Sequence, residues 1–168
     1  AIIGYKDSDT TANCKLIMSM WGAGDLFTMT NAGNVVISGS LSKGSGSFKI
    51  DHPLEAKKDT HHLVHSFIEG PQADNIYRGK VNLSSGSASV NIDTVAGMTE
   101  GAVAALNREV QCFTTNESGW TAIKGSVSGN VLTITAQENS CTDTISWMVI
   151  GERKDPHMMS ETTTWTDS

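Results

Sequence analysis

The sequence predicts an all-β protein: an intertwined β shaft followed by an antiparallel, jelly-roll-like β-sandwich tip, with three copies of the chain forming a homotrimer. The first 46 residues contain short apolar runs separated by Gly- and Asn-rich turns. From Ser47 onward the runs are longer and alternate between apolar and polar residues, which is typical of antiparallel strands joined by hairpins. Ser and Thr supply 37 of the 168 residues and add small polar side chains that suit exposed strand positions.

Residues 1–46 are predicted to form the shaft, with strands at 1–3, 15–21, 26–29 and 35–38. Strands of this length cannot bury their own apolar side chains, so neighbouring chains would have to supply the missing sheet and cover the strand edges. A loosely packed N-terminal arm is the alternative. Because the chain starts at Ala1 without a methionine, we expect it to be a fragment or a processed piece of a longer protein.

Residues 47–157 are predicted to form the globular C-terminal β-domain, and 158–168 a polar tail. One short helix is expected over 99–108, with Thr99 as its N-cap. Strands are expected near 47–50, 62–69, 76–83, 87–93, 110–115, 120–127, 131–136 and 143–152. The turns at 84–86 and 128–130 are each expected to join a hairpin. Period-two alternation assigns nine residues to the core: Ala88, Val90, Ile92, Leu132, Ile134, Ala136, Ile145, Trp147 and Val149.

Composition and charge exclude several classes of protein. A net charge of -6, with only 12 Lys and Arg residues, offers no basic surface for a nucleic acid. No apolar run approaches the roughly 18 residues that cross a bilayer, so membrane insertion is not expected. Cys14, Cys112 and Cys141 are odd in number and form no Cys-x-x-Cys pair, so they predict neither a disulfide framework nor a zinc ribbon. No cofactor is expected.

The cluster of His61, His62 and His65 is the strongest candidate for a metal site. On a helix, His61 and His65 would share a face and could hold zinc. The neighbouring Val64 and Phe67 favour a strand instead, in which four residues at about 3.3 Å each separate the pair by about 13 Å, too far for one ion. We therefore expect no metal site within one chain, although one histidine from each copy of a trimer could still meet at its axis.

No catalytic residues are expected, and we predict that the chain is not an enzyme. The sequence has no Gly-x-Ser-x-Gly elbow for a serine nucleophile, and no glycine cluster precedes the Lys-Ser/Thr pair of a phosphate loop. Acid pairs such as Asp7 and Asp9 are common among 18 acidic residues, and we interpret them as solvated turn residues.

Two loops carry the candidate ligand-binding residues. Asn116, Glu117 and Trp120 place an aromatic ring beside amide and carboxylate groups, the combination that stacks on a sugar and hydrogen-bonds to its hydroxyls. Packing of Trp120 in the core is the alternative. Tyr77 and Arg78 form a second candidate group at the edge of another loop.

Several long segments carry a resemblance to a known class of protein. These are 47–54 (SFKIDHPL), 64–69 (VHSFIE), 77–81 (YRGKV), 105–108 (ALNR) and 146–156 (SWMVIGERKDP). In this order they resemble the C-terminal region of tailed-bacteriophage tail fibre or tailspike proteins, over roughly 47–157.

The stretch 24–41 is similar to a fibre stalk that elsewhere leads into a self-cleaving chaperone. The Asp-x-Arg-Leu-Lys start of such chaperones is missing here, and GSFKID at 46–51 stands in its place, so autoproteolysis is not expected.

The resemblance implies a homotrimeric virion protein that is assembled in the host cytoplasm and acts outside the cell. Its expected function is host attachment by non-covalent recognition of a bacterial surface glycan, either lipopolysaccharide or capsule. Other tail proteins would be partners through an N-terminal part that precedes this chain. Two alternatives stay open: a structural module that trimerises or caps the fibre, and part of a surface-polysaccharide depolymerase.

Overall fold

The computed structural model describes residues 2–6, 15–41, 43–68, 70–155 and 158, and it confirms the all-β fold class. The chain divides into two compact units, Ala1–Phe67 and Ile68–Ser168. The sequence pattern predicts a boundary at 46/47 instead. The two described strands that follow Ser47 pair with each other in a sheet of their own and join neither sheet of the second unit. Within the described ranges, no helix has the length and apolar character needed to span a bilayer.

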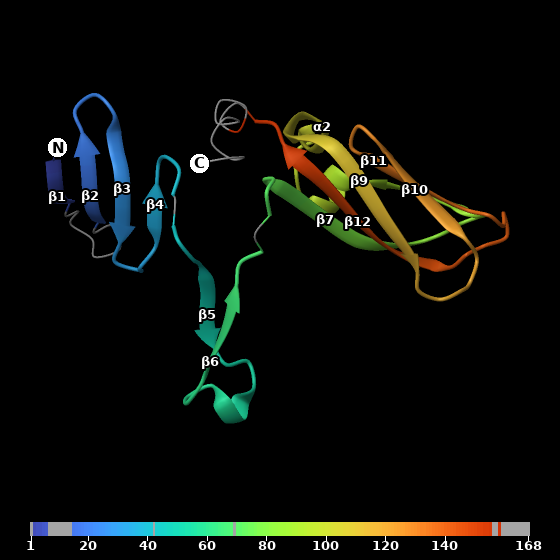
Figure 1. Ribbon diagram of the computed structural model, residues 1–168, viewed down its shortest axis with the longest axis horizontal. Coiled ribbons are helices and arrows are strands. Elements are labelled where there is room, and N and C mark those ends of the chain that lie inside the picture. The colour runs from blue at the N-terminus through green and yellow to red at the C-terminus, as the bar shows by residue number, and fades with distance from the viewer. Residues whose placement is uncertain (1, 7–14, 42, 69, 156–157, 159–168) are drawn as a thin grey trace. The chain divides into compact units, whose positions relative to one another are not determined.

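The first unit contains a four-stranded antiparallel sheet in the order β1-β2-β3-β4 (Figure 1). Its strands are β1 (Ile2–Lys6), β2 (Lys15–Met20), β3 (Gly24–Thr30) and β4 (Val35–Ile37). Gly22 and Gly33 lie in the two described turns with φ of 81°, a backbone conformation that glycine adopts without strain. The four strands lie within three residues of the expected ones.

A separate hairpin completes the first unit. It consists of β5 (Ser47–Asp51) and β6 (His62–Ser66), with a 3-10 helix η2 (Glu55–Lys57) between them. The edge of one ring faces the other where Phe48 meets His65, with 5.1 Å between the ring centroids. Phe48, Ile50 and Val64 nevertheless stay exposed, so the hairpin buries little apolar surface.

The second unit is a sandwich of two three-stranded antiparallel sheets (Figure 1). One sheet has the order β7-β12-β9 and the other β10-β11-β8. The strands are β7 (Asp74–Asn82), β8 (Ser87–Asn91), β9 (Asn107–Asn116), β10 (Ile123–Ser128), β11 (Val131–Ala136) and β12 (Thr144–Arg153). All six begin or end within a few residues of the predicted positions.

The two predicted turns have different roles. The turn at 128–130 joins β10 and β11, which are ladder partners, as expected for a hairpin. The turn at 84–86 is tight, with positive φ at Ser85 and Gly86, but it leads from β7 in one sheet to β8 in the other. It therefore carries the chain across the sandwich, and it does not close a two-stranded hairpin.

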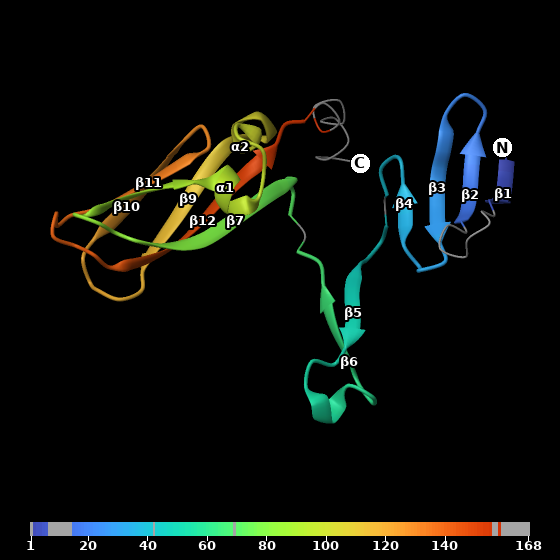
Figure 2. The same ribbon diagram turned by 180° about the vertical axis from the view of Figure 1, so that it is seen from behind.

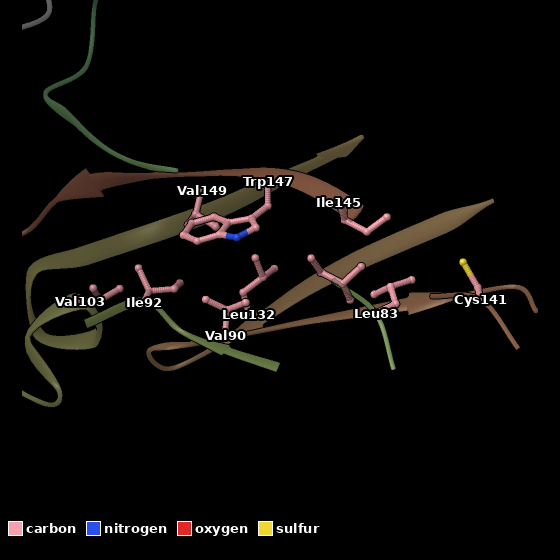
Figure 3. Close-up of a cluster of buried hydrophobic side chains, with 10 residues drawn as sticks. Leu83, Val90, Ile92, Val103, Leu132, Cys141, Ile145, Trp147 and Val149 are labelled. Atoms are coloured by element: carbon pink, nitrogen blue, oxygen red, sulfur yellow. The ribbon is translucent and has the colours of Figure 1, made fainter. Parts of the chain in front are cut away.

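The core lies between the two sheets and agrees with the predicted set. Figure 3 shows Ile145, Trp147 and Val149 of β12 facing Leu132 and Val90 of the opposite sheet. Of the nine predicted residues, seven are buried and the two alanines pack against them half-buried. Cys141 is buried and Cys112 is half-buried, and both are free thiols, whereas Cys14 lies outside the described residues.

The helical segment differs from its prediction. The structure has two short helices, α1 (Ile92–Ala96) and α2 (Ala102–Leu106), in place of one helix over 99–108. Thr99 is not the N-cap, because Gly101 occupies that position of α2 with a φ of 87°. Both helices lie at the end of the sandwich where β12 finishes (Figures 1 and 2).

A buried carboxylate holds this end of the sandwich together. Asp93 is fully buried and accepts hydrogen bonds from the backbone N–H groups of Gly101 and Val103, at 2.7 and 2.8 Å. The side-chain amide of Asn130 donates a third at 2.8 Å. Burial by itself raises the pKa of Asp93, but these hydrogen bonds more than offset it and leave the pKa below its usual value.

The predicted tail is described at one position only. Met158 is buried, and the remaining residues of 158–168 lie outside the described part of the chain.

Candidate ligand-binding site

The loop between β9 and β10 is held in place by its own polar groups. Asn116 accepts hydrogen bonds from the N–H groups of Ser118 and Gly119, at 3.2 and 2.9 Å, and donates to Asp143 at 2.7 Å. The hydroxyl of Ser118 accepts a hydrogen bond from the N–H of Thr144 at 2.8 Å. Asn116 therefore shapes the loop, and its amide is already engaged within the protein.

Trp120 projects from this fixed loop into solvent. Its side chain is fully exposed, at 103% of the reference area. The predicted strand over 120–127 begins later, at Ile123, which leaves Trp120 in the loop. The alternative in which Trp120 packs in the core is therefore excluded. The loop lies at the end of the sandwich opposite the two helices (Figure 1).

Glu117 leaves the same loop toward the outer face of the β7-β12-β9 sheet. Its carboxylate pairs with Lys80 at 2.6 Å and also accepts a hydrogen bond from the hydroxyl of Ser146. These two hydrogen bonds lower the pKa of Glu117 below its usual value, against the smaller opposing effect of burial. Glu117 is therefore an anion that balances the charge of Lys80.

Tyr77 and Arg78 are neighbours in β7, so their side chains point to opposite faces of the sheet. Tyr77 faces inward and packs against the core, and its hydroxyl accepts a hydrogen bond from Asn107 at 2.9 Å. Arg78 is exposed on the outer face. Of this second candidate group, only Arg78 is placed where a ligand could reach its polar end.

A groove of about 450 Å³ runs over that outer face. Its lining residues are Arg78, Gly79, Lys80, Phe113, Thr115, Ser146, Trp147 and Met148. Two of these lining residues, Lys80 and Ser146, contact Glu117 of the loop between β9 and β10. The groove therefore lies next to both candidate groups from the sequence, because it also contains Arg78.

Sequence reasoning missed Phe113, Thr115 and Met148. They occupy the strand positions that alternate with the buried ones, so alternation could have placed them on the outer face. It could not have shown which outer residues meet, because that depends on the order and register of β7, β12 and β9.

Of the three clustered histidines, two lie in β6 and His61 immediately precedes it. His62 and His65 are in β6, and His62 faces Asp51 across the hairpin at 3.5 Å. His61 contacts the hydroxyl of Thr60, and His52 accepts a hydrogen bond from the N–H of Leu54. His157 lies outside the described residues. Within the part of the chain that the structure describes, no three acid, cysteine or histidine side chains come together as metal ligands would.

Comparisons with known proteins add no assignment. No protein-family model matches the chain, and no curated protein is significantly similar to it.

Proposed function

We propose that the chain is the C-terminal part of a bacteriophage tail fibre or tailspike and that it binds a bacterial surface glycan without cleaving it. The observation that carries this proposal is the fully exposed Trp120 on a loop that Asn116 and Ser118 fix in place. An exposed indole offers an apolar face on which a sugar ring can stack. A loop that is already ordered loses little conformational entropy when it binds.

The resemblance of 47–157 to phage fibre proteins supports the same function. On this proposal the chain acts as part of a virion outside the bacterial cell, and lipopolysaccharide or capsule is its receptor. Other tail proteins would be its further partners. The polar groups that orient the sugar would come from the loop and from the sheet face beside Glu117.

The test is an array of bacterial lipopolysaccharides and capsular polysaccharides probed with the intact chain. The proposal predicts retention of at least one glycan class, with no new reducing ends after prolonged incubation. Retention accompanied by new reducing ends would identify a depolymerase. If no glycan is retained, the adhesin function is wrong.

A second candidate function, trimerisation of the fibre, is favoured by the first unit. Strand register places seven apolar residues on one face of its sheet: Ile3, Leu16, Met18, Phe27, Met29, Val35 and Ile37. Six of them are exposed, with exposed fractions of 38 to 71%, and Phe27 is half-buried. A face of this kind gains stability when it is covered. On this proposal, other copies of the chain cover it in a homotrimer.

A further inference from the structure

The outer face of the β7-β12-β9 sheet has a regular arrangement of charged, polar and apolar side chains. Cross-strand register aligns three rows on it: Ile76, Ile150 and Gln111; then Arg78, Met148 and Phe113; then Lys80, Ser146 and Thr115. The groove described above lies over the second and third rows. Its outer strands are two strand spacings apart, or about 10 Å.

The positive charges of the groove are not equivalent. Lys80 is paired with Glu117 at 2.6 Å, so together they contribute no net charge. The side chain of Arg78 has no ion pair or hydrogen bond within the described part of the chain, and it is exposed. The groove therefore presents one uncompensated guanidinium on a protein whose net charge is -6.

The wall opposite Arg78 is apolar. Phe113 is 49% exposed, although it lies in the middle of a ten-residue strand. Met148 lies between Arg78 and Phe113 and forms an apolar floor. In the next row, the hydroxyl of Thr115 offers a donor and an acceptor, whereas the hydroxyl of Ser146 donates to Glu117 and offers only its oxygen as an acceptor.

We propose that this groove binds an acidic sugar, with the guanidinium of Arg78 on its acid group and the ring of Phe113 against its apolar face. The inference rests on the proposed glycan-binding function and names the class of glycan. Arginine suits this role because its fork of N–H donors matches the two oxygens of a carboxylate and also binds phosphate.

The experiment is a calorimetric titration of the intact chain with three probes. Tetragalacturonate carries sugar carboxylates, its methyl ester has the same sugars without the charge, and glucose 6-phosphate tests whether phosphate serves as the acid group. We expect tetragalacturonate or glucose 6-phosphate to bind at millimolar concentration or below. If tetragalacturonate is the ligand, the ester binds at least roughly tenfold more weakly.

Two groove variants and one control complete the test. Arg78→Gln and Phe113→Ala should each weaken binding of the acidic probe by roughly tenfold, and Arg78→Lys should lose less than Arg78→Gln. Lys124→Gln removes one positive charge from an exposed position on the opposite sheet and should leave binding unchanged. Near-ultraviolet circular dichroism checks that each variant keeps its fold.

Two titration results would overturn the inference. Either neither acidic probe binds, or tetragalacturonate and its methyl ester bind equally while glucose 6-phosphate does not bind. Two variant results would also overturn it: unchanged binding in Arg78→Gln, or a fall in oligomeric mass in Phe113→Ala. The last would assign the groove to contacts between copies. The proposed function fails separately, because the glycan array tests it without reference to the groove. If glycan binding on the array is lost when Trp120 is replaced and unchanged when Arg78 is replaced, the proposed function holds and only the acidic-sugar inference is wrong.

Discussion

At the scale of single residues, the same side-chain type has opposite roles at two positions. Trp147 is buried in the core and Trp120 is fully exposed. Alternation along β12 predicts the inward position of Trp147, because its neighbours at two-residue spacing are also apolar. Trp120 sits in a loop, where no such periodicity exists, so its exposure depends on how Asn116 and Ser118 hold the backbone. The amino-acid pattern by itself therefore leaves both interpretations of Trp120 open.

The sequence did not reveal that Asp93 is a buried carboxylate that accepts three hydrogen bonds. This carboxylate makes the stability of the sandwich depend on pH. Its folded-state pKa is lowered, as are those of Glu117 and Glu152, the latter by a hydrogen bond from Arg108. An acid with a lowered pKa contributes stability above its unfolded pKa of about 4, and this contribution is lost as the pH falls through the folded value. We therefore expect the sandwich to become less stable below about pH 4.

The variant Asp93→Asn tests this assignment. Asparagine cannot accept from all three donors with the strength of a carboxylate, so the urea midpoint at pH 7 should fall. The loss of stability between pH 5 and pH 3 should also become shallower, because one linked proton is removed. Asp74→Asn, at an exposed strand end, is the control and should behave like the parent protein. An unchanged midpoint and an unchanged pH slope in Asp93→Asn would contradict the role of Asp93.

At the scale of elements, the strands were predictable and the helices were not. Each strand of the sandwich shows period-two alternation, and that pattern depends only on local sequence. The segment Ile92–Ala96 continues the apolar pattern of β8 but turns into α1, because Asn91 caps its first turn through a 3.1 Å hydrogen bond to the N–H of Thr94. Asp93 then joins α1 to the start of α2, a contact between residues eight and ten positions apart.

The backbone of β7 lies close to a buried side chain of β12, so a larger residue at this point of β7 should destabilise the sandwich. Gly79 lies opposite Trp147 in the ladder, and a Cβ at Gly79 would come within 2.6 Å of Cζ2 of the indole. Gly79→Ala should therefore force the buried ring to move and destabilise the sandwich by about 1–3 kcal/mol in urea unfolding. Gly70→Ala in the same unit is the control, because its Cβ would meet only an ordinary contact at 3.6 Å. Equal urea midpoints for Gly79→Ala and Gly70→Ala would show that the indole of Trp147 does not restrict the size of the side chain at position 79.

At the scale of the whole molecule, the two units differ in how much apolar surface they bury. The sandwich encloses a core of ten buried residues, whereas the sheet of the first unit leaves an apolar face exposed. The sequence suggested this contrast through strand length. It could not show that the hairpin of β5 and β6 groups with the first unit, because its alternation resembles that of the sandwich strands.

The exposed face of the first unit predicts self-association. Light scattering should give about three times the chain mass of 17.9 kDa for the intact protein. Val35→Asp places a charge on the apolar face and should reduce that mass, whereas Val36→Asp on the other face of β4 should not. A monodisperse folded monomer at micromolar concentration would refute the trimer, and equal effects of the two variants would refute the assignment of the contact face.

We propose that Trp120 forms the receptor site, and a calorimetric comparison of two proteins tests this role. The glycan that the array retains most strongly is titrated into the parent protein and into Trp120→Ala. Because the indole is fully exposed, the substitution should change the unfolding free energy by no more than about 0.5 kcal/mol. Loss of the stacking contact should weaken binding by roughly tenfold per site, and by more in avidity if three sites act together. A folded Trp120→Ala protein that binds the glycan as tightly as its parent would show that Trp120 is not the receptor site.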